Sequence, residues 1–130
     1  MLEPGTVVDG RFIVEQLVGQ GGLAEVYRVR HTELGSLHAL KLLSFRKKKL
    51  EERLLLEGKI QAQLRHPNLV AVTDLVRHDG RVGLLMEYID HEALDSYIER
   101  HGAMECEPAL ALMAPILSGI VAAHDAGVLH

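Results

Sequence analysis

Residues 18–27 have the sequence VGQGGLAEVY, and Lys41 follows in the run LHALKLL. Gly19, Gly21 and Gly22 allow the backbone to adopt positive φ angles and to approach a phosphate more closely than larger residues would. A lysine shortly after such a loop supplies a cation for the same phosphate. The loop and the lysine together therefore predict a site that holds the phosphates of a nucleotide.

A second kind of nucleotide site shares these glycines, because Gly19, Gly21 and Ala24 also satisfy the dinucleotide-binding pattern GxGxxG/A. That pattern needs a helix that begins at the loop and offers its N-terminus to a pyrophosphate. Residues 25–30, EVYRVR, instead alternate β-branched or aromatic residues with charged ones, which predicts a strand. The loop is therefore expected to connect two strands, and the dinucleotide alternative is disfavoured.

The composition is that of an ordinary soluble chain. Its 130 residues, 48% of them hydrophobic, suffice for one domain or for one lobe of a larger domain. A net charge of −4 gives no positive field for nucleic acid. No apolar run reaches the roughly 18 to 20 residues that span a bilayer, and no signal peptide is evident. We therefore expect a cytoplasmic protein without a membrane segment.

Metal binding is not expected from these residues. The single cysteine, Cys106, can form neither an internal disulfide nor a CxxC metal site. None of the eight histidines forms a pair at i, i+3 or i+4 spacing with a third ligand nearby. The sequence therefore predicts no metal ligands within the chain.

The hydrophobic pattern up to residue 88 predicts five strands and one helix. Alternation along the third strand places Ala39 and Lys41 on one face. The helix is rich in Lys, Glu, Arg and Leu and carries Glu57 within an otherwise apolar face. Asp79-Gly80 predicts the turn of the last hairpin. The expected strands are residues 12–18, 25–29, 37–43, 69–76 and 82–88, and the expected helix is residues 45–64.

From residue 89 onward the pattern changes to two helices, at residues 91–100 and 107–126, each followed by a glycine. Pro115 lies inside the second helix and is expected to bend it or to delay its start. Met113, Leu117 and Ile120 lie along its apolar face.

Seven segments in the order PGTVVDGRF, VGQGGLAEVY, HALKLL, a helix containing Glu57, HPNLVAV, LLMEYID and AHDAGVLH resemble the amino-terminal half of a bacterial Hanks-type serine/threonine protein kinase. The resemblance covers practically the whole chain. It implies an α+β fold in which residues 1–88 form the ATP-binding N-lobe, a five-stranded antiparallel sheet with one C-type helix. Residues 89–130 would form the hinge and the first two helices of the C-lobe.

The resemblance implies roles for individual residues in transferring the ATP γ-phosphate to serine or threonine hydroxyls of proteins. Lys41 would contact the α and β phosphates, and Glu57 would hold Lys41 by a salt bridge when its helix moves inward. Met86 would limit the pocket behind the adenine, and the backbone of Glu87 and Ile89 would pair with the adenine edge. The remaining nucleotide-binding residues would be Val18, Gly19, Gln20, Gly21, Gly22, Leu23 and Ala24 over the phosphates, and Val18, Val26 and Ala39 around the adenine. The last three are also explained as ordinary core residues, and both roles can hold together.

The chain departs from the family pattern at four positions. Ala24 replaces a common third glycine, and Leu23 replaces a Met or aromatic residue at the loop tip. Gln61 stands where an apolar side chain is usual, and Gly58 weakens the helix by up to about 1 kcal/mol. The last two departures lead us to expect a helix that is easily displaced.

Residues 128–130 match the start of the catalytic loop HRD. By the resemblance, the catalytic aspartate and the residues that hold Mg²⁺ in the complete domain would follow residue 130. We therefore expect residues 1–130 alone to transfer no phosphate and to expose Met113, Leu117 and Ile120 for self-association or a partner. The alternative is a naturally short, non-catalytic nucleotide-binding or interaction module that resembles a pseudokinase.

Overall fold

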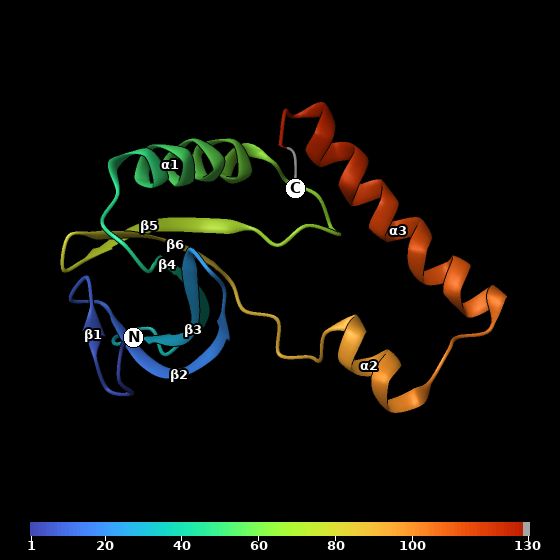
Figure 1. Ribbon diagram of the computed structural model, residues 1–130, viewed down its shortest axis with the longest axis horizontal. Coiled ribbons are helices and arrows are strands. Elements are labelled where there is room, and N and C mark those ends of the chain that lie inside the picture. Colours follow the sequence, from blue (N-terminus) through green and yellow to red (C-terminus); the bar gives the residue numbers. More distant parts are fainter. Residues whose placement is uncertain (129–130) are drawn as a thin grey trace.

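A computed structural model of the chain describes residues 1–128. It has a strongly curled antiparallel sheet of six strands in the order β1-β2-β3-β4-β6-β5, with helix α1 lying across one face and helices α2 and α3 to the side (Figure 1). The start of the catalytic loop, predicted at residues 128–130, lies outside the described residues except for Val128. The α+β class is confirmed. The elements are β1 (Val7–Val8), β2 (Phe12–Gln20), β3 (Ala24–His31), β4 (Leu37–Leu43), α1 (Lys48–Gln63), β5 (Val72–His78), β6 (Arg81–Glu87), α2 (Leu94–His101) and α3 (Cys106–Asp125).

The five predicted strands are present, and β4 has the predicted bounds. The sheet contains one further strand, β1, in which Val7 pairs with Ile13 and Val8 with Phe12. A two-residue segment is too short to show alternation, so its sequence carries no strand signal. The turn predicted at Asp79-Gly80 is confirmed, with φ angles of 48° and 70°, which is the geometry of a two-residue hairpin turn.

Apolar residues cover both faces of the curled sheet. The cluster inside the curl consists of Val8, Phe12, Val14, Tyr27, Val29, Leu40, Leu42, Val76 and Leu85. The opposite face packs against α1 through Leu43, Leu54, Val82 and Leu84. Because successive side chains of a strand point to opposite faces, Leu42 and Leu43 belong to different clusters. The same alternation places Lys41 on the face that α1 covers.

Helix α1 approaches the sheet closely at Gly58. A Cβ atom on Gly58 would lie 2.6 Å from Cδ2 of Leu84, a side chain that is only 2% exposed. The glycine therefore permits the close packing of α1 on β6, besides lowering helix propensity. The hypothesis that α1 is easily displaced stays a prediction.

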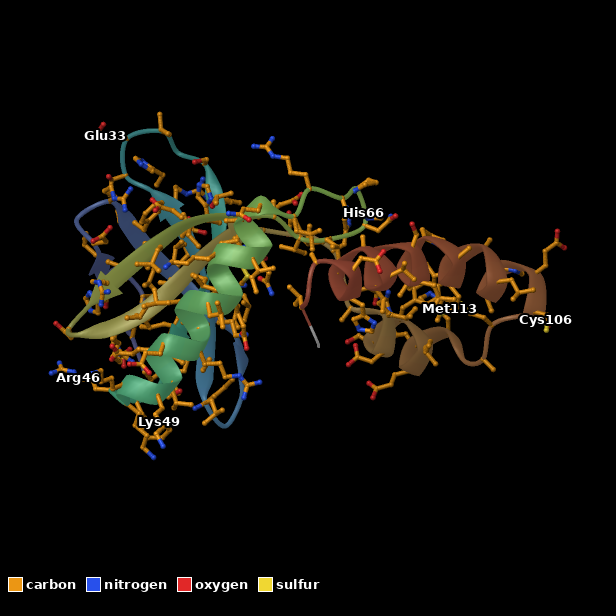
Figure 2. The ribbon with its side chains drawn as sticks, turned by 90° about the horizontal axis from the view of Figure 1, so that it is seen from above. Glu33, Arg46, Lys49, His66, Cys106 and Met113 are labelled. Carbon is orange, nitrogen blue, oxygen red and sulfur yellow. The ribbon has the colours of Figure 1, made fainter. Side chains whose placement is uncertain are left out.

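Helix α3 is attached to the sheet domain near its C-terminal end. Nε2 of His66 lies 3.2 Å from Oγ of Ser118, and a Cβ on Gly119 would lie 3.0 Å from the carbonyl oxygen of Asn68. Small residues on α3 thus let it approach the segment between α1 and β5, and Figure 2 shows His66 beside the helix and Cys106 at its far end. The helix begins at Cys106, so the later start suggested by Pro115 is not observed.

One helix, α3, bears on the expectation that the chain has no membrane segment, which stays a prediction. Its 20 residues have a mean hydropathy of 1.7, so this helix is long and apolar enough to cross a membrane by length and composition. Glu107 and the prolines interrupt its apolar residues, so the helix contains no long uninterrupted apolar run. Core helices of soluble proteins pass the same test. Met113 and Leu117 are exposed as predicted, whereas Ile120 is half-buried.

Candidate nucleotide-binding site

The glycine loop connects β2 and β3, as the sequence predicts. The backbone N–H of Gly21 donates to the carbonyl of Ala24 at 2.9 Å and closes the loop, and the N–H of Ser44 donates to the carbonyl of Leu23 at 3.0 Å. This second bond ties the loop tip to the end of β4. The loop therefore lies beside the strand that carries Lys41.

The three glycines do not use positive φ angles in this structure. Positive values occur at other glycines, such as Gly35 and Gly80, but not at Gly19, Gly21 or Gly22. A Cβ on Gly22 would meet nothing within 4 Å, and one on Gly21 would lie 3.7 Å from the carbonyl oxygen of Ala24. The backbone conformation and packing of the loop therefore do not by themselves require glycine at these positions.

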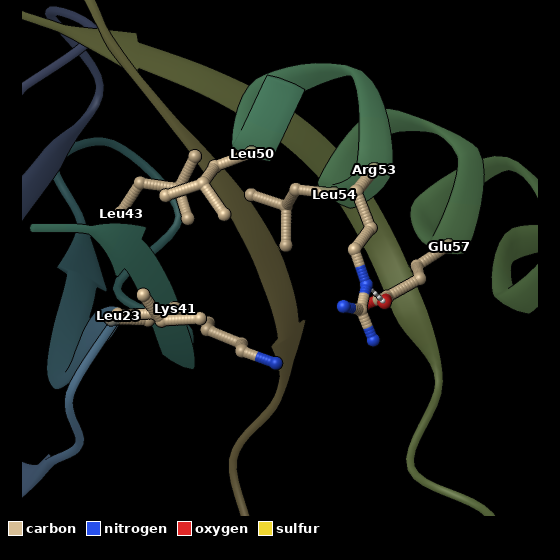
Figure 3. Close-up of a pocket in the computed structure, with 8 residues that line it drawn as sticks. Leu23, Lys41, Leu43, Leu50, Arg53, Leu54 and Glu57 are labelled. Carbon is tan, nitrogen blue, oxygen red and sulfur yellow. Dashed lines mark hydrogen bonds and ion pairs between the residues drawn. The ribbon is translucent and has the colours of Figure 1, made fainter. Parts of the chain in front are cut away.

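Lys41 and Glu57 line the same cavity between the sheet and α1, although they come from different elements (Figure 3). The apolar part of the cavity comes from the loop tip, from β4 and from the first turns of α1. Its volume is about 190 Å³, and its lining residues are Leu23, Ala24, Lys41, Leu43, Leu50, Arg53, Leu54 and Glu57. The structure thus brings together the cation and the carboxylate that the sequence singled out.

The carboxylate of Glu57 is paired with a different cation. Nε of Arg53, one turn earlier on α1, donates to Oε1 of Glu57 at 3.0 Å. Within residues 1–128, Lys41 makes no ion pair at 4.0 Å or less. The predicted salt bridge between Lys41 and Glu57 is thus not formed here, and its formation on inward movement of the helix stays a prediction. The sequence reasoning missed Arg53, whose i, i+4 spacing from Glu57 was the available signal.

Strand register aligns the residues predicted to surround the adenine. Val26 of β3 lies opposite Lys41 of β4, and Ala39 lies opposite Met86 of β6. Directly opposed residues of an antiparallel pair project to the same face, so these four side chains share the face that bears the cavity. Val18 lies at a register irregularity of β2 and is exposed.

Met86 also borders a second cavity, of about 230 Å³. Gln61 of α1 and Ala123 of α3 contribute to its lining. The polar Gln61 therefore faces a largely apolar space, at a position where the family resemblance predicted an apolar side chain. This cavity lies between the sheet domain and the C-terminal helix.

The residues predicted to pair with an adenine edge lie at the last position of β6, Glu87, and two positions later, Ile89. The N–H of Glu87 donates to the carbonyl of Ala71 at 2.9 Å, and Ile89 is exposed. The guanidinium of Arg28 lies 5.9 Å from the centre of the Tyr88 ring, and its Nε lies 2.8 Å from Oε2 of Glu15. The hydrogen bond to Tyr88 raises the pKa of Arg28. Arg28 of β3 thus ties Tyr88 to the sheet and is itself held by Glu15 of β2, and the sequence carried no signal for these contacts.

No group of three or more His, Cys, Asp or Glu side chains that could hold a metal ion is present among residues 1–128. A hard cation such as Mg²⁺ needs oxygen ligands in near-octahedral geometry. Mg²⁺ is commonly held by one or two carboxylates together with substrate phosphates, so the expectation that the chain holds no metal ligands stays a prediction.

Comparison with known proteins places the chain among kinases. Residues 12–130 match the family model described as protein kinase domain. The serine/threonine-protein kinase PknH of Mycobacterium tuberculosis (strain ATCC 25618 / H37Rv) is 33% identical over 124 residues, which cover 93% of this chain and 20% of PknH. The serine/threonine-protein kinase PrkC of Bacillus subtilis (strain 168) is 31% identical over 129 residues, which cover 97% of this chain and 20% of PrkC. The chain thus spans about a fifth of the length of these relatives.

Solved structures give the same result for the fold. The crystal structure of the Mycobacterium tuberculosis PknI kinase domain has a TM-score of 0.79 and 28% identity, and the match covers 100% of this chain and 53% of that one. The crystal structure of Rad53 1-466 in complex with AMP-PNP has a TM-score of 0.81 and 26% identity, over 92% of this chain and 32% of that one. The PknI match thus includes the sheet and the helices described above.

Proposed function

Because the chain belongs to the protein kinase family, we propose that residues 1–88 bind ATP as the N-lobe of a serine/threonine protein kinase and that residues 89–130 begin its C-lobe. The complete kinase would transfer the γ-phosphate of ATP to serine or threonine hydroxyls of proteins. A cytoplasmic location for this kinase portion belongs to the same proposal.

The observation that carries the proposal is the cavity shared by Lys41 and Glu57. Strand β4 and helix α1 bring an ammonium and a carboxylate to one space, and the tip of the glycine loop forms another wall of that space. An ammonium there would contact the α and β phosphates, and a nearby carboxylate would fix its position. Catalysis of phosphoryl transfer depends mainly on such positioning and on charge stabilisation.

The glycines support the same proposal. Neither positive φ angles nor close neighbours require glycine at residues 21 and 22. Their small size is best explained by a ligand that lies against the loop backbone. A phosphate chain that lies against the backbone would accept hydrogen bonds from the loop N–H groups. Gly19, Gln20, Leu23 and Ala24 complete this phosphate-facing loop in the proposal.

The adenine would lie against the apolar face next to Lys41. Val18, Val26 and Ala39 would contact the ring, and Met86 would close the space behind it. The carbonyl of Glu87 and the N–H of Ile89 would pair with the adenine edge. Strand register supports this arrangement because it places Val26, Ala39 and Met86 on the face that bears Lys41.

We further propose that residues 1–130 alone bind nucleotide without transferring phosphate. They offer Lys41 for the phosphates and Glu57 to hold Lys41, but the described residues form no acidic cluster for Mg²⁺. The family uses ATP with Mg²⁺, and the complete domain would supply those ligands. A protein substrate would also be bound by the complete domain.

The test is titration of the purified 130-residue protein with ATP by calorimetry. Weak binding is expected, and Lys41→Met should weaken it at least about fivefold because a charge-assisted contact to phosphate is lost. Lys59→Met is the matched control, because Lys59 is exposed on α1 and does not line the cavity. Equal affinities for the two variants would refute the assignment of Lys41. Transfer of labelled phosphate to a generic protein substrate would refute only the expectation that these residues are inactive.

A further inference from the structure

The cavity between β4 and α1 carries two cations and one carboxylate. Lys41 and Arg53 supply the positive charges, and Glu57 supplies the negative one. In Figure 3 the guanidinium of Arg53 extends from α1 into the space that Lys41 enters from the sheet. The cavity therefore has a net positive charge on the side where the phosphates of a nucleotide are proposed to lie.

The contact that holds Arg53 is weak. It is a single Nε to Oε1 contact of 3.0 Å between side chains that are 74% and 35% exposed. The arginine precedes the glutamate at i, i+4, which is the less favourable order on a helix. Such an exposed pair shifts an equilibrium by only about twofold, so a stronger anion can draw the guanidinium away.

A polyphosphate is such an anion. It carries several negative charges, and a planar guanidinium can donate two parallel N–H bonds to one phosphate group. A carboxylate that gives up Arg53 keeps its charge inside the cavity that Lys41 also lines. The arrival of the phosphates would therefore change both ion pairs together.

We propose that Arg53 is a second phosphate-binding cation of this site, held by Glu57 until a polyphosphate reaches Lys41. Arg53 then turns to the terminal phosphate, and Glu57 becomes available to pair with Lys41. This inference rests on the proposed nucleotide-binding function. In this inference one arginine on α1 couples phosphate binding to the formation of the Lys41–Glu57 pair.

Helix α1 offers a matched control. Lys48 and Glu52 form another i, i+4 pair on the same helix, with Nζ 4.0 Å from Oε1 and side chains 90% and 63% exposed. Neither residue lines the cavity. Lys48→Gln thus removes the same formal charge and a similar pair from the same helix, outside the proposed site.

The experiment measures the affinity of the 130-residue protein for ATP, ADP and adenosine by calorimetry at constant ionic strength. Arg53→Gln should weaken ATP binding about three- to tenfold, as expected for a charge-assisted hydrogen bond in a partly exposed site. Adenosine binding should be unchanged, since it has no phosphate. Arg53→Lys should retain part of the affinity, and Lys48→Gln should stay within about twofold of the unsubstituted chain.

The outcomes separate this inference from the function on which it rests. If the unsubstituted chain binds ATP and Arg53→Gln binds it equally well or more tightly, the inference is overturned while nucleotide binding stands. An equal loss for ATP and adenosine would also overturn it, because the role of Arg53 would then be structural. If the unsubstituted chain binds no ATP, the proposed function fails and this inference fails with it.

Discussion

Replacement of Gly58 by alanine sets helix propensity against packing. Alanine is favoured over glycine inside a helix by about 1 kcal/mol. The added Cβ, however, would lie 2.6 Å from Cδ2, 3.3 Å from Cδ1 and 3.6 Å from Cγ of Leu84. Leu84 is almost fully buried, and overpacking of this kind costs about 1–3 kcal/mol. We therefore expect Gly58→Ala to lower the free energy of unfolding by up to about 2 kcal/mol net.

The assay is urea unfolding followed by far-ultraviolet circular dichroism, in a double-mutant cycle with Leu84→Ala. Leu84→Ala alone should cost about 2–5 kcal/mol because it leaves a cavity. In that background the clash is absent, so Gly58→Ala should become stabilising by about 1 kcal/mol. The sign of the Gly58→Ala effect should thus reverse between the two backgrounds.

One result would refute this reasoning. A cavity of about 200 Å³ lies next to Gly58 and is lined also by Leu55, Val72 and Leu84. If Gly58→Ala stabilised the unsubstituted chain by about 1 kcal/mol, Leu84 would have turned into that cavity. Close packing would then not be the reason for glycine at this position.

Two further predictions concern charged groups in the sheet. Burial and the neighbouring His31 lower the pKa of His38, so the unfolded chain binds a proton more readily than the folded one. The free energy of unfolding should therefore fall as the pH drops below about 6.5. In urea titrations at several pH values this fall should be smaller for His38→Gln, and an unchanged fall would exclude His38 as the cause. Glu25 is buried and accepts a hydrogen bond from the Tyr27 hydroxyl at 2.6 Å, with Nη1 of Arg81 3.5 Å away. Glu25→Gln should therefore lower the free energy of unfolding, measured in urea, by about 1–3 kcal/mol. The exposed control Glu52→Gln should lower it by less than about 1 kcal/mol. Equal losses would mean that burial of the carboxylate is not decisive.

Much of the fold was predictable because its signals are local. Alternation along residues 37–43 gave the exact bounds of β4, and Asp79-Gly80 gave the turn between β5 and β6. Strand β1 was not predictable, since two residues carry no period and pairing with β2 creates the strand. The apolar length of α3 was underestimated because interruptions by Glu107 and the prolines conceal a helix whose mean hydropathy is high.

The candidate site was predictable in its membership and less so in its contacts. The sequence singled out Lys41 and Glu57, and the structure places both in one cavity. The sequence predicted a salt bridge between Lys41 and Glu57 when the helix moves inward, whereas in the structure Glu57 pairs with Arg53. Side-chain partners depend on where α1 sits relative to the sheet, which the packing of Gly58 on Leu84 influences.

The sequence by itself determined the order of the helices and of all strands except β1, the loop between two strands and the faces on which Lys41 and Glu57 lie, because these follow from residue periods and backbone preferences along the chain. Tertiary structure decided that Gly58 allows close contact with Leu84 and that Glu57 pairs with Arg53 and not with Lys41. Those facts depend on distances between segments remote in sequence, or between side chains with several rotamers. Such distances are fixed only when α1 packs on the sheet.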